Sequence, residues 1–162
     1  MDTDLVIRAQ RGDQAAFAEI ASTTYGRLHS LAYVILRDRA LAEDAVQQAM
    51  LDAWRNLPKL RDPARFDAWT YRLTVNVCYA EAKRSKRWLP NMPIDTPREP
   101  AAPDEIGLVA DRELLDRGFR RLSVDQRAVL VLRHVVGLPL EEVAATLGIP
   151  PGTARSRLYR AL

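Results

Sequence analysis

The sequence predicts an all-α protein built from two small helical domains: a four-helix N-terminal domain and a C-terminal domain with a helix-turn-helix. Three observations predict this fold. Apolar residues recur at helical spacing along most of the chain. Five of the ten prolines lie between positions 90 and 103 and divide the chain into two parts. The last forty residues read as two packed helices, a glycine-containing turn and a third helix. No stretch argues for a sheet.

The first two helices are placed by their end signals. A short helix is expected over residues 4–10, closed by Arg11 and Gly12. Asp13 can cap a longer helix that runs to about residue 36. The apolar residues of that helix near helical register are Ala16, Phe17, Ile20, Tyr25, Leu28, Leu31, Ala32 and Ile35. Gly26 lies within this stretch, and a glycine inside a helical pattern makes an unbroken helix less expected.

A third helix is expected over residues 40–57, where Pro58 ends it. The positions expected to face inward are small or aliphatic: Ala42, Ala45, Val46, Ala49, Ala53 and Leu57. The polar positions expected to point largely outward are Glu43, Asp44, Gln47, Gln48 and Asp52. Such a face is usually just solvated. A loop rich in charge follows at residues 59–65.

The fourth helix, expected over residues 66–87, carries two kinds of surface. Its apolar side is expected to consist of Trp69, Leu73, Val77 and Ala80. A neighbouring stripe at i, i+4, i+7 and i+11 consists of Arg72, Asn76, Tyr79 and Lys83. Cations, an amide and an aromatic ring are the groups that track and stack on nucleic acid. The alternative is that Tyr79 belongs to the core and the other three are solvated.

The proline-rich segment, residues 90–104, is expected to be a flexible linker. After it, a helix over residues 105–122 would turn Leu108, Leu115, Phe119 and Leu122 inward. Ser123 and Gln126 form a capping-box pattern at the start of the next helix, which runs to Gly137. Within that helix Ala128, Val129, Leu132, Val135 and Val136 recur at helical spacing. A short helix over residues 140–147 ends at Gly148.

The last helix has a basic outer face. At about 100° per residue, Arg155, Ser156, Tyr159 and Arg160 fall on one arc, with Thr153 and Arg157 at its flanks. Arginine pairs in a bidentate manner with guanine edges and is attracted to phosphate. The alternative is an ordinary solvated face. After two short helices and a turn, however, the pattern favours a helix that reads DNA.

Composition describes a soluble globular protein, with 48% hydrophobic and 28% charged residues. The net charge is only +3, so the basic character is local: four of the five residues at 83–87 are lysine or arginine. There is no apolar run of the ~18–20 residues that a membrane span needs, and the N-terminus has no signal-peptide character. A single cysteine, Cys78, excludes an internal disulfide and a cysteine-based metal cluster. We expect a cytoplasmic protein without metal or cofactor.

Taken in order, these motifs resemble the extracytoplasmic-function (ECF) class of bacterial RNA polymerase sigma factors. The C-terminal motifs are Leu-Ser-Val-Asp-Gln-Arg-Ala-Val-Leu at 122–130 and Ile-Pro-Pro-Gly-Thr-Ala-Arg-Ser-Arg-Leu at 149–158. The N-terminal motifs are Ala-Glu-Asp-Ala-Val-Gln at 42–47 and Phe-Asp-Ala-Trp-Thr-Tyr-Arg-Leu at 66–73, followed by Asn76. The resemblance implies a region-two domain at 1–89, the linker at 90–104 and a region-four domain at 105–162. Two tethered DNA-facing surfaces can each bind weakly and still act together.

The resemblance also implies the partners and the residues that meet them. Core RNA polymerase would be bound at the clamp helices of its largest subunit by Glu43, Asp44, Gln47, Gln48 and Leu51, and at the flap of its second subunit. The minus-ten promoter element would be opened and held by Lys59, Arg61, Arg65, Arg72, Asn76, Tyr79, Lys83, Arg84, Lys86 and Arg87. The minus-thirty-five element would be read by Thr153, Arg155, Ser156, Arg157, Tyr159 and Arg160.

The sequence departs from the pattern of this class at three places, and the resemblance implies one further partner. Ala80 stands where an acid is frequent, and Pro139 stands where a capping serine or threonine is common. The helix that here stops at Leu162 usually continues in this class with more basic residues. An anti-sigma protein, often membrane-bound, commonly restrains such factors, and it would hold the chain at the membrane without any insertion of the chain itself.

Two other functions compete with this interpretation. A conventional helix-turn-helix regulator would bind a duplex operator without polymerase. An enzyme would need a reactive constellation, and its candidates are only His29, His134, Cys78 and scattered carboxylates. No phosphate-binding glycine loop or metal-ligand spacing occurs. We therefore expect no catalysis by this chain alone.

Overall fold

The structure, a computed structural model, describes residues 1–88, 118–119 and 121–162, without the side chains of residues 85–88. These described residues form helices, turns and loops and no strand, which confirms the all-α prediction. The expected linker at 90–104 lies outside the described residues. Of the helix expected at 105–122, residues 105–117 and 120 also lie outside them, while residues 118, 119 and 121 are helical.

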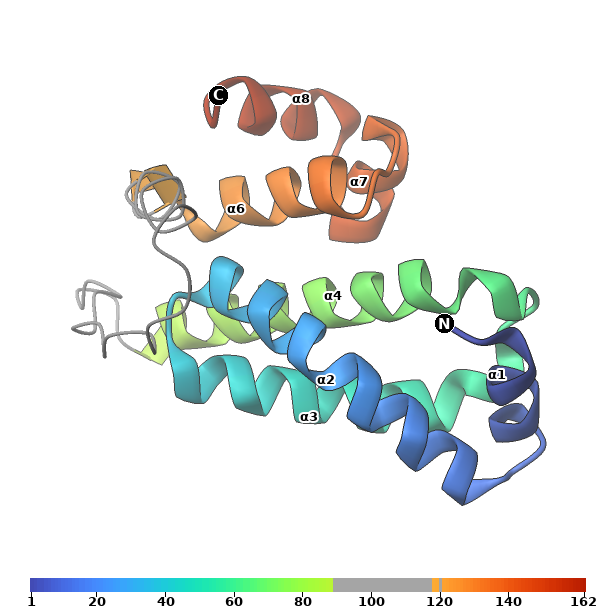
Figure 1. The fold of residues 1–162 in the computed structure, drawn as a ribbon. Helices are drawn as coiled ribbons and strands as arrows, with labels where there is room; N and C mark the ends of the chain where they lie inside the picture. Colours follow the sequence, from blue (N-terminus) through green and yellow to red (C-terminus); the bar gives the residue numbers. More distant parts are fainter. Residues whose placement is uncertain (89–117, 120) are drawn as a thin grey trace, which may run out of the picture.

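The first two helices begin at aspartate caps. In α1 (Thr3–Gln10), the Asp2 carboxylate accepts a hydrogen bond from the backbone N–H of Asp4 at 3.0 Å. In α2 (Gln14–Leu36), the Asp13 carboxylate accepts one from Ala16 at 3.0 Å. Each carboxylate satisfies a backbone donor that the first turn leaves unpaired. The helix α2 passes Gly26 without a break, so one long helix crosses the N-terminal domain (Figure 1).

The helix α3 (Arg39–Asn56) packs against both α2 and α4 (Phe66–Trp88). Two short 3₁₀ turns, Leu57–Lys59 and Pro63–Arg65, connect α3 to α4. The six inward positions expected for this helix and its end are all buried: Ala42, Ala45, Val46, Ala49, Ala53 and Leu57. The predicted register of α3 is therefore confirmed. Because four of these residues are alanines, the three helices can approach one another closely.

The buried face of α4 differs from the expected one. Trp69, Leu73 and Val77 are only half-buried and Ala80 is exposed, so the predicted apolar side is wrong in register. The buried face instead contains Phe66, Thr70, Thr74, Val75, Cys78, Tyr79 and Ala82. The Thr70 and Thr74 hydroxyls donate to the carbonyls four residues earlier, at 3.0 and 2.9 Å. Because these hydroxyls are satisfied within the helix, threonine can occupy the core, and a search for apolar residues alone misses it.

The C-terminal domain follows the predicted helix-turn-helix with one difference. The capping box at α6 (Val124–Leu130) is confirmed: Gln126 N–H donates to Ser123 Oγ at 3.2 Å, and Ser123 N–H donates to Gln126 Oε1 at 2.8 Å. The expected single helix then changes into a π-helical turn, Val131–Val135, which places one more residue in the turn. Val135, one of the apolar residues at helical spacing, lies in this turn and is 64% exposed.

The helices α7 (Leu140–Leu147) and α8 (Pro151–Tyr159) complete this domain. Gly148 ends α7 with φ +62°, in the left-handed region that glycine adopts without strain. Pro139 stands at the start of α7 and supplies no side-chain cap. Proline at positions 150 and 151 suits the start of α8, where a backbone donor would be unpaired in any case.

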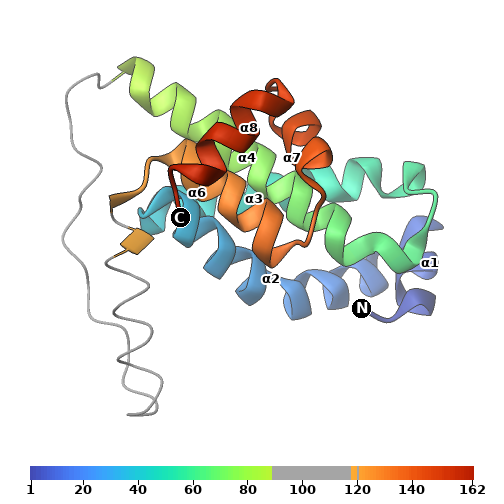
Figure 2. The same ribbon diagram turned by 90° about the horizontal axis from the view of Figure 1, so that it is seen from above.

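The two halves of the chain share one apolar core. A cluster of buried residues joins Leu28 and Ile35 of α2 with Val75 of α4 and Val129 of α6. Figures 1 and 2 show α6 crossing over α2 and α4, with α7 and α8 on the same side. A second cluster lies around α1, where Val6, Ile20, Leu57 and Phe66 are fully buried. No described helix is both long and apolar enough to span a bilayer.

Candidate nucleic-acid and polymerase interfaces

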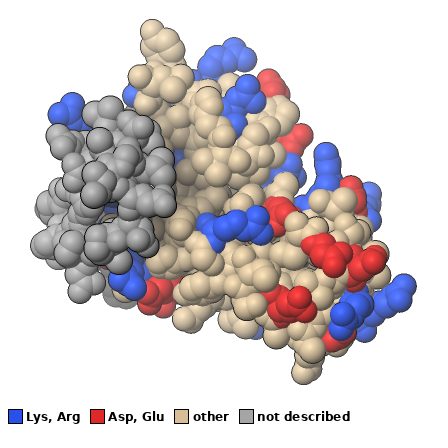
Figure 3. All heavy atoms as spheres, in the orientation of Figure 1, with Lys and Arg blue, Asp and Glu red and all other residues tan. Residues whose placement is uncertain are grey.

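The outer face of α8 is basic and exposed. Arg155, Tyr159 and Arg160 are exposed, Tyr159 at 83%. Thr153 and Ser156 are half-buried beside them, and Ala154 is fully buried against the rest of the domain. Gln126 Nε2 donates to the Arg160 carbonyl at 3.2 Å, which ties the end of α8 to the start of α6. The arc inferred from helical spacing is therefore presented outward. In the orientation of Figure 3, several basic side chains are visible near the upper edge of the molecule.

Arg157 differs from its neighbours on α8, because its side chain is directed toward the N-terminal domain. Its Nη1 donates to the phenolic oxygen of Tyr79 on α4 at 2.9 Å. Its Nη2 lies 3.2 Å from a carboxylate oxygen of Asp125 on α6. Only 23% of the side chain is exposed. Arg157 thus joins three helices, and the inferred flanking position on the DNA-reading arc is engaged within the protein.

The residues of the nucleic-acid stripe expected on α4 differ in exposure. Asn76 and Lys83 are exposed, whereas Tyr79 is only 6% exposed. The Lys83 ammonium lies 4.2 Å from the centre of the Tyr79 ring, a cation–π contact. Arg84 pairs with Glu81 at 2.8 Å. Lys86 and Arg87 belong to α4, but their side chains lie outside the described residues.

Arg72, one end of that stripe, forms a salt bridge with Glu142 of α7. The pair joins residues separated by 70 positions in the chain. Arg72 Nε is buried and has no hydrogen-bond partner within the part of the chain that the structure describes. Arg72 and Tyr79, two turns apart on α4, are therefore both in contact with the helix-turn-helix domain, through α7 and α8 respectively.

The loop before α4 exposes three cations, Lys59, Arg61 and Arg65. Lys59 Nζ donates to Asn56 Oδ1 at 3.3 Å. Gln10 Nε2 donates to the carbonyls of Leu57 and Leu60, at 3.1 and 2.8 Å, and so α1 holds the loop in place. Sequence reasoning did not single out Gln10, since a pairing between the first helix and a loop fifty residues later leaves no local signal.

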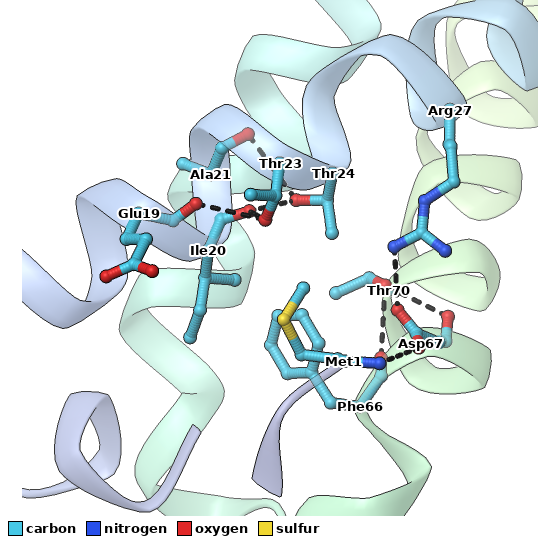
Figure 4. Close-up of polar contacts among 10 residues, drawn as sticks. All are labelled: Met1, Glu19, Ile20, Ala21, Thr23, Thr24, Arg27, Phe66, Asp67 and Thr70. Carbon is cyan, nitrogen blue, oxygen red and sulfur yellow. Dashed lines mark hydrogen bonds and ion pairs between the residues drawn. The ribbon is translucent and has the colours of Figure 1, made fainter. Parts of the chain in front are cut away.

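The start of α4 is fixed by a charged contact that the sequence did not reveal. Asp67 in the first turn pairs with Arg27 of α2 at 3.1 Å and with the amino group of Met1 at 2.9 Å (Figure 4). Figure 4 shows Arg27 and the amino group of Met1 both directed at the Asp67 carboxylate, while the hydroxyls of Thr24 and Thr70 donate to carbonyls of their own helices. An acid in the first turn is also favoured by the partial positive charge of the helix N-terminus. This contact orients α4 against α2.

The polar face of α3 adjoins an apolar groove. Asp44, Gln47 and Gln48 are exposed, Glu43 is half-buried and pairs with Arg39 at 3.3 Å, and Leu51 is 51% exposed. Leu51 belongs to a groove of about 610 Å³ between α2 and α3. The groove is lined by Gln14, Phe17, Ala21, Tyr25, Gln47, Met50, Leu51 and Trp54. An exposed leucine beside carboxylates and amides makes an amphipathic surface that suits a protein partner.

His29, His134 and Cys78, the residues weighed as catalytic, differ in their surroundings: His29 is half-buried, His134 is exposed and Cys78 is buried. The ring of His29 stacks on that of Tyr25 with centres 6.0 Å apart, and His134 is exposed. Cys78 is fully buried, and desolvation raises the pKa of its thiol to about 12. Among the described residues, no group of three histidine, cysteine or acidic side chains could hold a metal ion.

Two family models match the chain. The model described as "Sigma-70 region 2" matches residues 20–88, and "Sigma-70, region 4" matches residues 112–162. The ECF RNA polymerase sigma factor SigM of Mycobacterium tuberculosis (strain H37Rv) is 32% identical over 168 residues, covering 99% of this chain and 80% of SigM. The ECF RNA polymerase sigma-E factor of Escherichia coli K12 is 32% identical over 174 residues, covering 99% of this chain and 90% of that protein.

The chain is also similar in fold to solved structures. The chain is similar to CnrH, solved in complex with the cytosolic domain of CnrY, with a TM-score of 0.58 and 27% identity over 99% of this chain and 91% of CnrH. The sigma factor RpoE of Bartonella quintana, solved with the anti-sigma factor NepR, gives a TM-score of 0.63. At 24% identity, over 90% of this chain and 91% of that one, RpoE supports the fold alone.

Proposed function

The chain belongs to the ECF class of RNA polymerase sigma factors and directs promoter-specific transcription initiation, and we propose how its surfaces divide that task. Residues 1–89 form a region-two domain that binds polymerase and opens the minus-ten element. Residues 105–162 form a region-four domain that reads the minus-thirty-five element, and residues 90–104 connect the two.

The polymerase contact is assigned to α3. Glu43, Asp44, Gln47 and Gln48 provide charge and hydrogen-bonding capacity for the clamp helices of the largest polymerase subunit, and the exposed Leu51 provides the apolar centre. Apolar groups surrounded by polar ones are the usual anatomy of a protein interface. A second contact, between the region-four domain and the flap of the second polymerase subunit, would place the two DNA-facing surfaces along the promoter.

The minus-ten contact is assigned to α4 and the loop before it. Asn76 is exposed on α4, so its amide is free to hydrogen-bond a base. Lys59, Arg61 and Arg65 of the loop, with Lys83, Arg84, Lys86 and Arg87 of α4, would meet phosphates and give the affinity its salt dependence. Arg72 and Tyr79 complete this surface when the helix-turn-helix domain leaves them.

The minus-thirty-five contact is assigned to the outer face of α8. The observation that carries this assignment is the exposure of Arg155, Tyr159 and Arg160 on one face of a helix that follows a helix and a tight turn. Thr153, Ser156 and Arg157 flank that face. Because an arginine bonds both acceptors of a guanine edge, loss of such a contact costs roughly 1–3 kcal/mol.

Regulation by an anti-sigma protein is proposed from the similar structures, two of which are complexes: CnrH with the cytosolic domain of CnrY, and RpoE with the anti-sigma factor NepR. Such a partner would hold this chain in the cytoplasm or at the inner surface of the membrane. We also propose that the chain has no catalytic activity of its own, because the chemistry of RNA synthesis belongs to the polymerase.

The test is run-off transcription from a pool of genomic upstream fragments, with bacterial core polymerase and with or without the protein. Transcripts that begin at defined sites only when the protein is added support the proposal. Arg155→Ala should then reduce initiation at promoters with an intact minus-thirty-five element, and Asn76→Ala should reduce opening of the minus-ten element. Specific duplex binding without any polymerase-dependent transcript would instead favour a conventional regulator.

A further inference from the structure

The loop between α3 and α4, residues 57–65, has little internal structure to fix its course. It consists of two 3₁₀ turns, each closed by a backbone hydrogen bond within the turn, at 3.1 Å in the first and 3.0 Å in the second. Between the turns the chain passes through the exposed Arg61. Because a backbone that can adopt several shapes loses entropy when it binds, such a loop needs an anchor outside itself to bind in one shape.

Gln10, the last residue of α1, provides a polar anchor. Its Nε2 donates to the carbonyl of Leu57 at 3.1 Å and to the carbonyl of Leu60 at 2.8 Å, across 47 and 50 positions of the chain. The NH2 end of an amide has two donors, and here both are used on the backbone of the loop. Both bonds are partly buried, where an unpaired carbonyl would be costly. One side chain of the first helix thus fixes the first turn of the loop.

The apolar face of α1 supports the same loop beside Gln10. Leu57 at the start of the loop and Phe66 directly after it are fully buried, and both belong to the cluster that contains Val6 of α1. Leu60 packs against this cluster. Figure 1 shows α1 beside the connection between α3 and α4. Apolar contacts therefore hold the two ends of the loop to α1, and hydrogen bonds from Gln10 hold the chain between them.

The other side of the loop is open. Lys59, Arg61 and Arg65 are exposed, while the carbonyls of Leu57 and Leu60 are engaged by Gln10. A loop held in this way presents its outer groups in a single arrangement. Since a loop that can adjust would accept several bases about equally, a fixed loop favours one base over the others.

We propose that Gln10 is a positioning residue for minus-ten recognition, and that it fixes the loop at 57–65 in the shape that receives an unpaired base of the promoter strand. This inference rests on the function proposed for the loop and α4, and it extends that function to α1. Gln10 acts through the carbonyls of Leu57 and Leu60 rather than on the DNA. Loss of its donors should cost discrimination between bases more than overall DNA affinity, because the cations of the loop remain.

The first test measures the loop itself in the full chain, by hydrogen exchange of backbone amides in peptides that cover residues 57–65. Gln10→Met and Gln10→Glu keep about the length of the side chain and remove both donors, and methionine adds no charge. Both variants should raise the exchange rate of the loop amides about tenfold, as expected for the loss of hydrogen bonds of ordinary strength. Amides of α2 and α4 should exchange as in the parent.

Two results of this test would overturn the proposal. Unchanged exchange of the loop in both variants would show that Gln10 does not hold it. An increase spread equally over the loop, α2 and α4 would show that Gln10 supports the fold as a whole and has no particular role in the loop.

The second test measures base discrimination with core polymerase, at a promoter identified by run-off transcription with the parent protein. Initiation at that promoter is compared with initiation at versions that carry one substituted base in the minus-ten element. Gln10→Met should reduce the preference for the original base about tenfold at the position that the loop receives, since small displacements of positioning groups have effects of this size or larger. Affinity for core polymerase should not change, because Gln10 faces the loop and does not line the groove beside Leu51. Equal loss of initiation at all versions would refute the positioning role.

Arg8→Lys is the matched control on the same helix. At about 100° per residue, Arg8 lies on nearly the opposite side of α1 from Gln10. Its guanidinium donates to Asp13 twice, at 3.0 and 2.7 Å, so lysine weakens that contact and keeps the charge. The control should change neither loop exchange nor base preference. The parent protein separates the two proposals: initiation with an unaltered base preference in Gln10→Met rejects the positioning role alone, and no initiation by the parent rejects the proposed function.

Discussion

Arg157 on α8 donates a hydrogen bond to the phenolic oxygen of Tyr79 on α4, across 78 positions of the chain and at 2.9 Å. Each residue belongs to a helix assigned to a different promoter element. Their contact therefore links the two proposed DNA-binding surfaces directly, and it connects the stability of the fold to the accessibility of the surface proposed on α4.

Removal of the Tyr79 hydroxyl should weaken this link without disturbing the core. We expect Tyr79→Phe to lower the free energy of unfolding by about 1 kcal/mol, because the ring stays buried while one hydrogen bond to a charged group is lost. Urea unfolding followed by circular dichroism would measure this. Tyr71→Phe, on the same helix and half-buried, is the control. Equal effects of the two substitutions would contradict a structural role for the contact.

The capping box at the start of α6 should contribute to the stability of the helix-turn-helix. Ser123→Ala removes the acceptor for the Gln126 N–H and should cost about 1 kcal/mol. Ser30→Ala is a suitable control, because the Ser30 hydroxyl donates only to the Gly26 carbonyl of its own helix, at 2.9 Å. A shift in the denaturation midpoint that is no larger for Ser123→Ala than for Ser30→Ala would argue against the capping box.

Asp13 should make stability depend on pH in the acid range. Hydrogen bonding from the Ala16 N–H, followed by that from Arg8, lowers the pKa of Asp13 below its usual 3.8. Since the folded pKa is the lower one, the contribution of the carboxylate is present above pH 3.8 and is lost as the pH falls through the folded pKa.

Asp13→Asn tests that dependence, because asparagine still caps the helix but carries no charge. The variant should unfold at a lower urea concentration than the parent at pH 7, and the difference should narrow at pH 3. Glu19→Gln, an exposed acid of the same helix, should show no such narrowing. A constant difference between Asp13→Asn and the parent would exclude the charge as its source.

Cys78 should be inert in the folded protein. It is fully buried, and its thiol pKa of about 12 leaves almost no thiolate at pH 8. A thiol-reactive disulfide reagent should therefore modify Cys78 only as fast as the protein unfolds. In a Cys78→Ala background, Ala80→Cys provides an exposed thiol on the same helix and should react within seconds. Fast modification of Cys78 without denaturant would show that the α4 core opens readily.

Leu51 should matter for polymerase binding and little for folding. Its side chain is 51% exposed on α3. Leu51→Ser should lower the affinity for core polymerase about tenfold, because burial of a leucine at an interface contributes roughly 1.5–3 kcal/mol. Ala18→Ser, on an exposed position of α2, is the control. Unchanged affinity in a polymerase pull-down titration would remove Leu51 from the interface.

The sequence predicted the features that depend on near neighbours in the chain. The caps at Asp13 and Ser123 and the glycine at the end of α7 depend on backbone groups within a few residues. The alanine face of α3 follows from helical periodicity alone. The family was also predictable, because it is carried by contiguous motifs.

The features that escaped prediction depend on distant partners or on unusual local chemistry. The buried stripe of α4 was misplaced because Thr70 and Thr74 satisfy their hydroxyls within the helix. The inward turn of Arg72 and Arg157 depends on the association of the two domains, which periodicity does not encode. For Tyr79 the sequence favoured a nucleic-acid contact over a core position, and the structure buries its ring in the core.

The π-helical turn at Val131–Val135 has a consequence for how chains of this fold can vary in length. A wide turn holds a surplus residue, so deletion of one residue there could tighten it to ordinary α-helical winding and leave α6 and α7 near their present places. The helix α3 has no wide turn that could absorb the loss of a residue. A deletion within it would rotate all following side chains by about 100° and carry its inward alanines toward solvent. Single-residue gaps between relatives should therefore gather at 131–135 and avoid α3, a pattern that an alignment of their sequences would reveal.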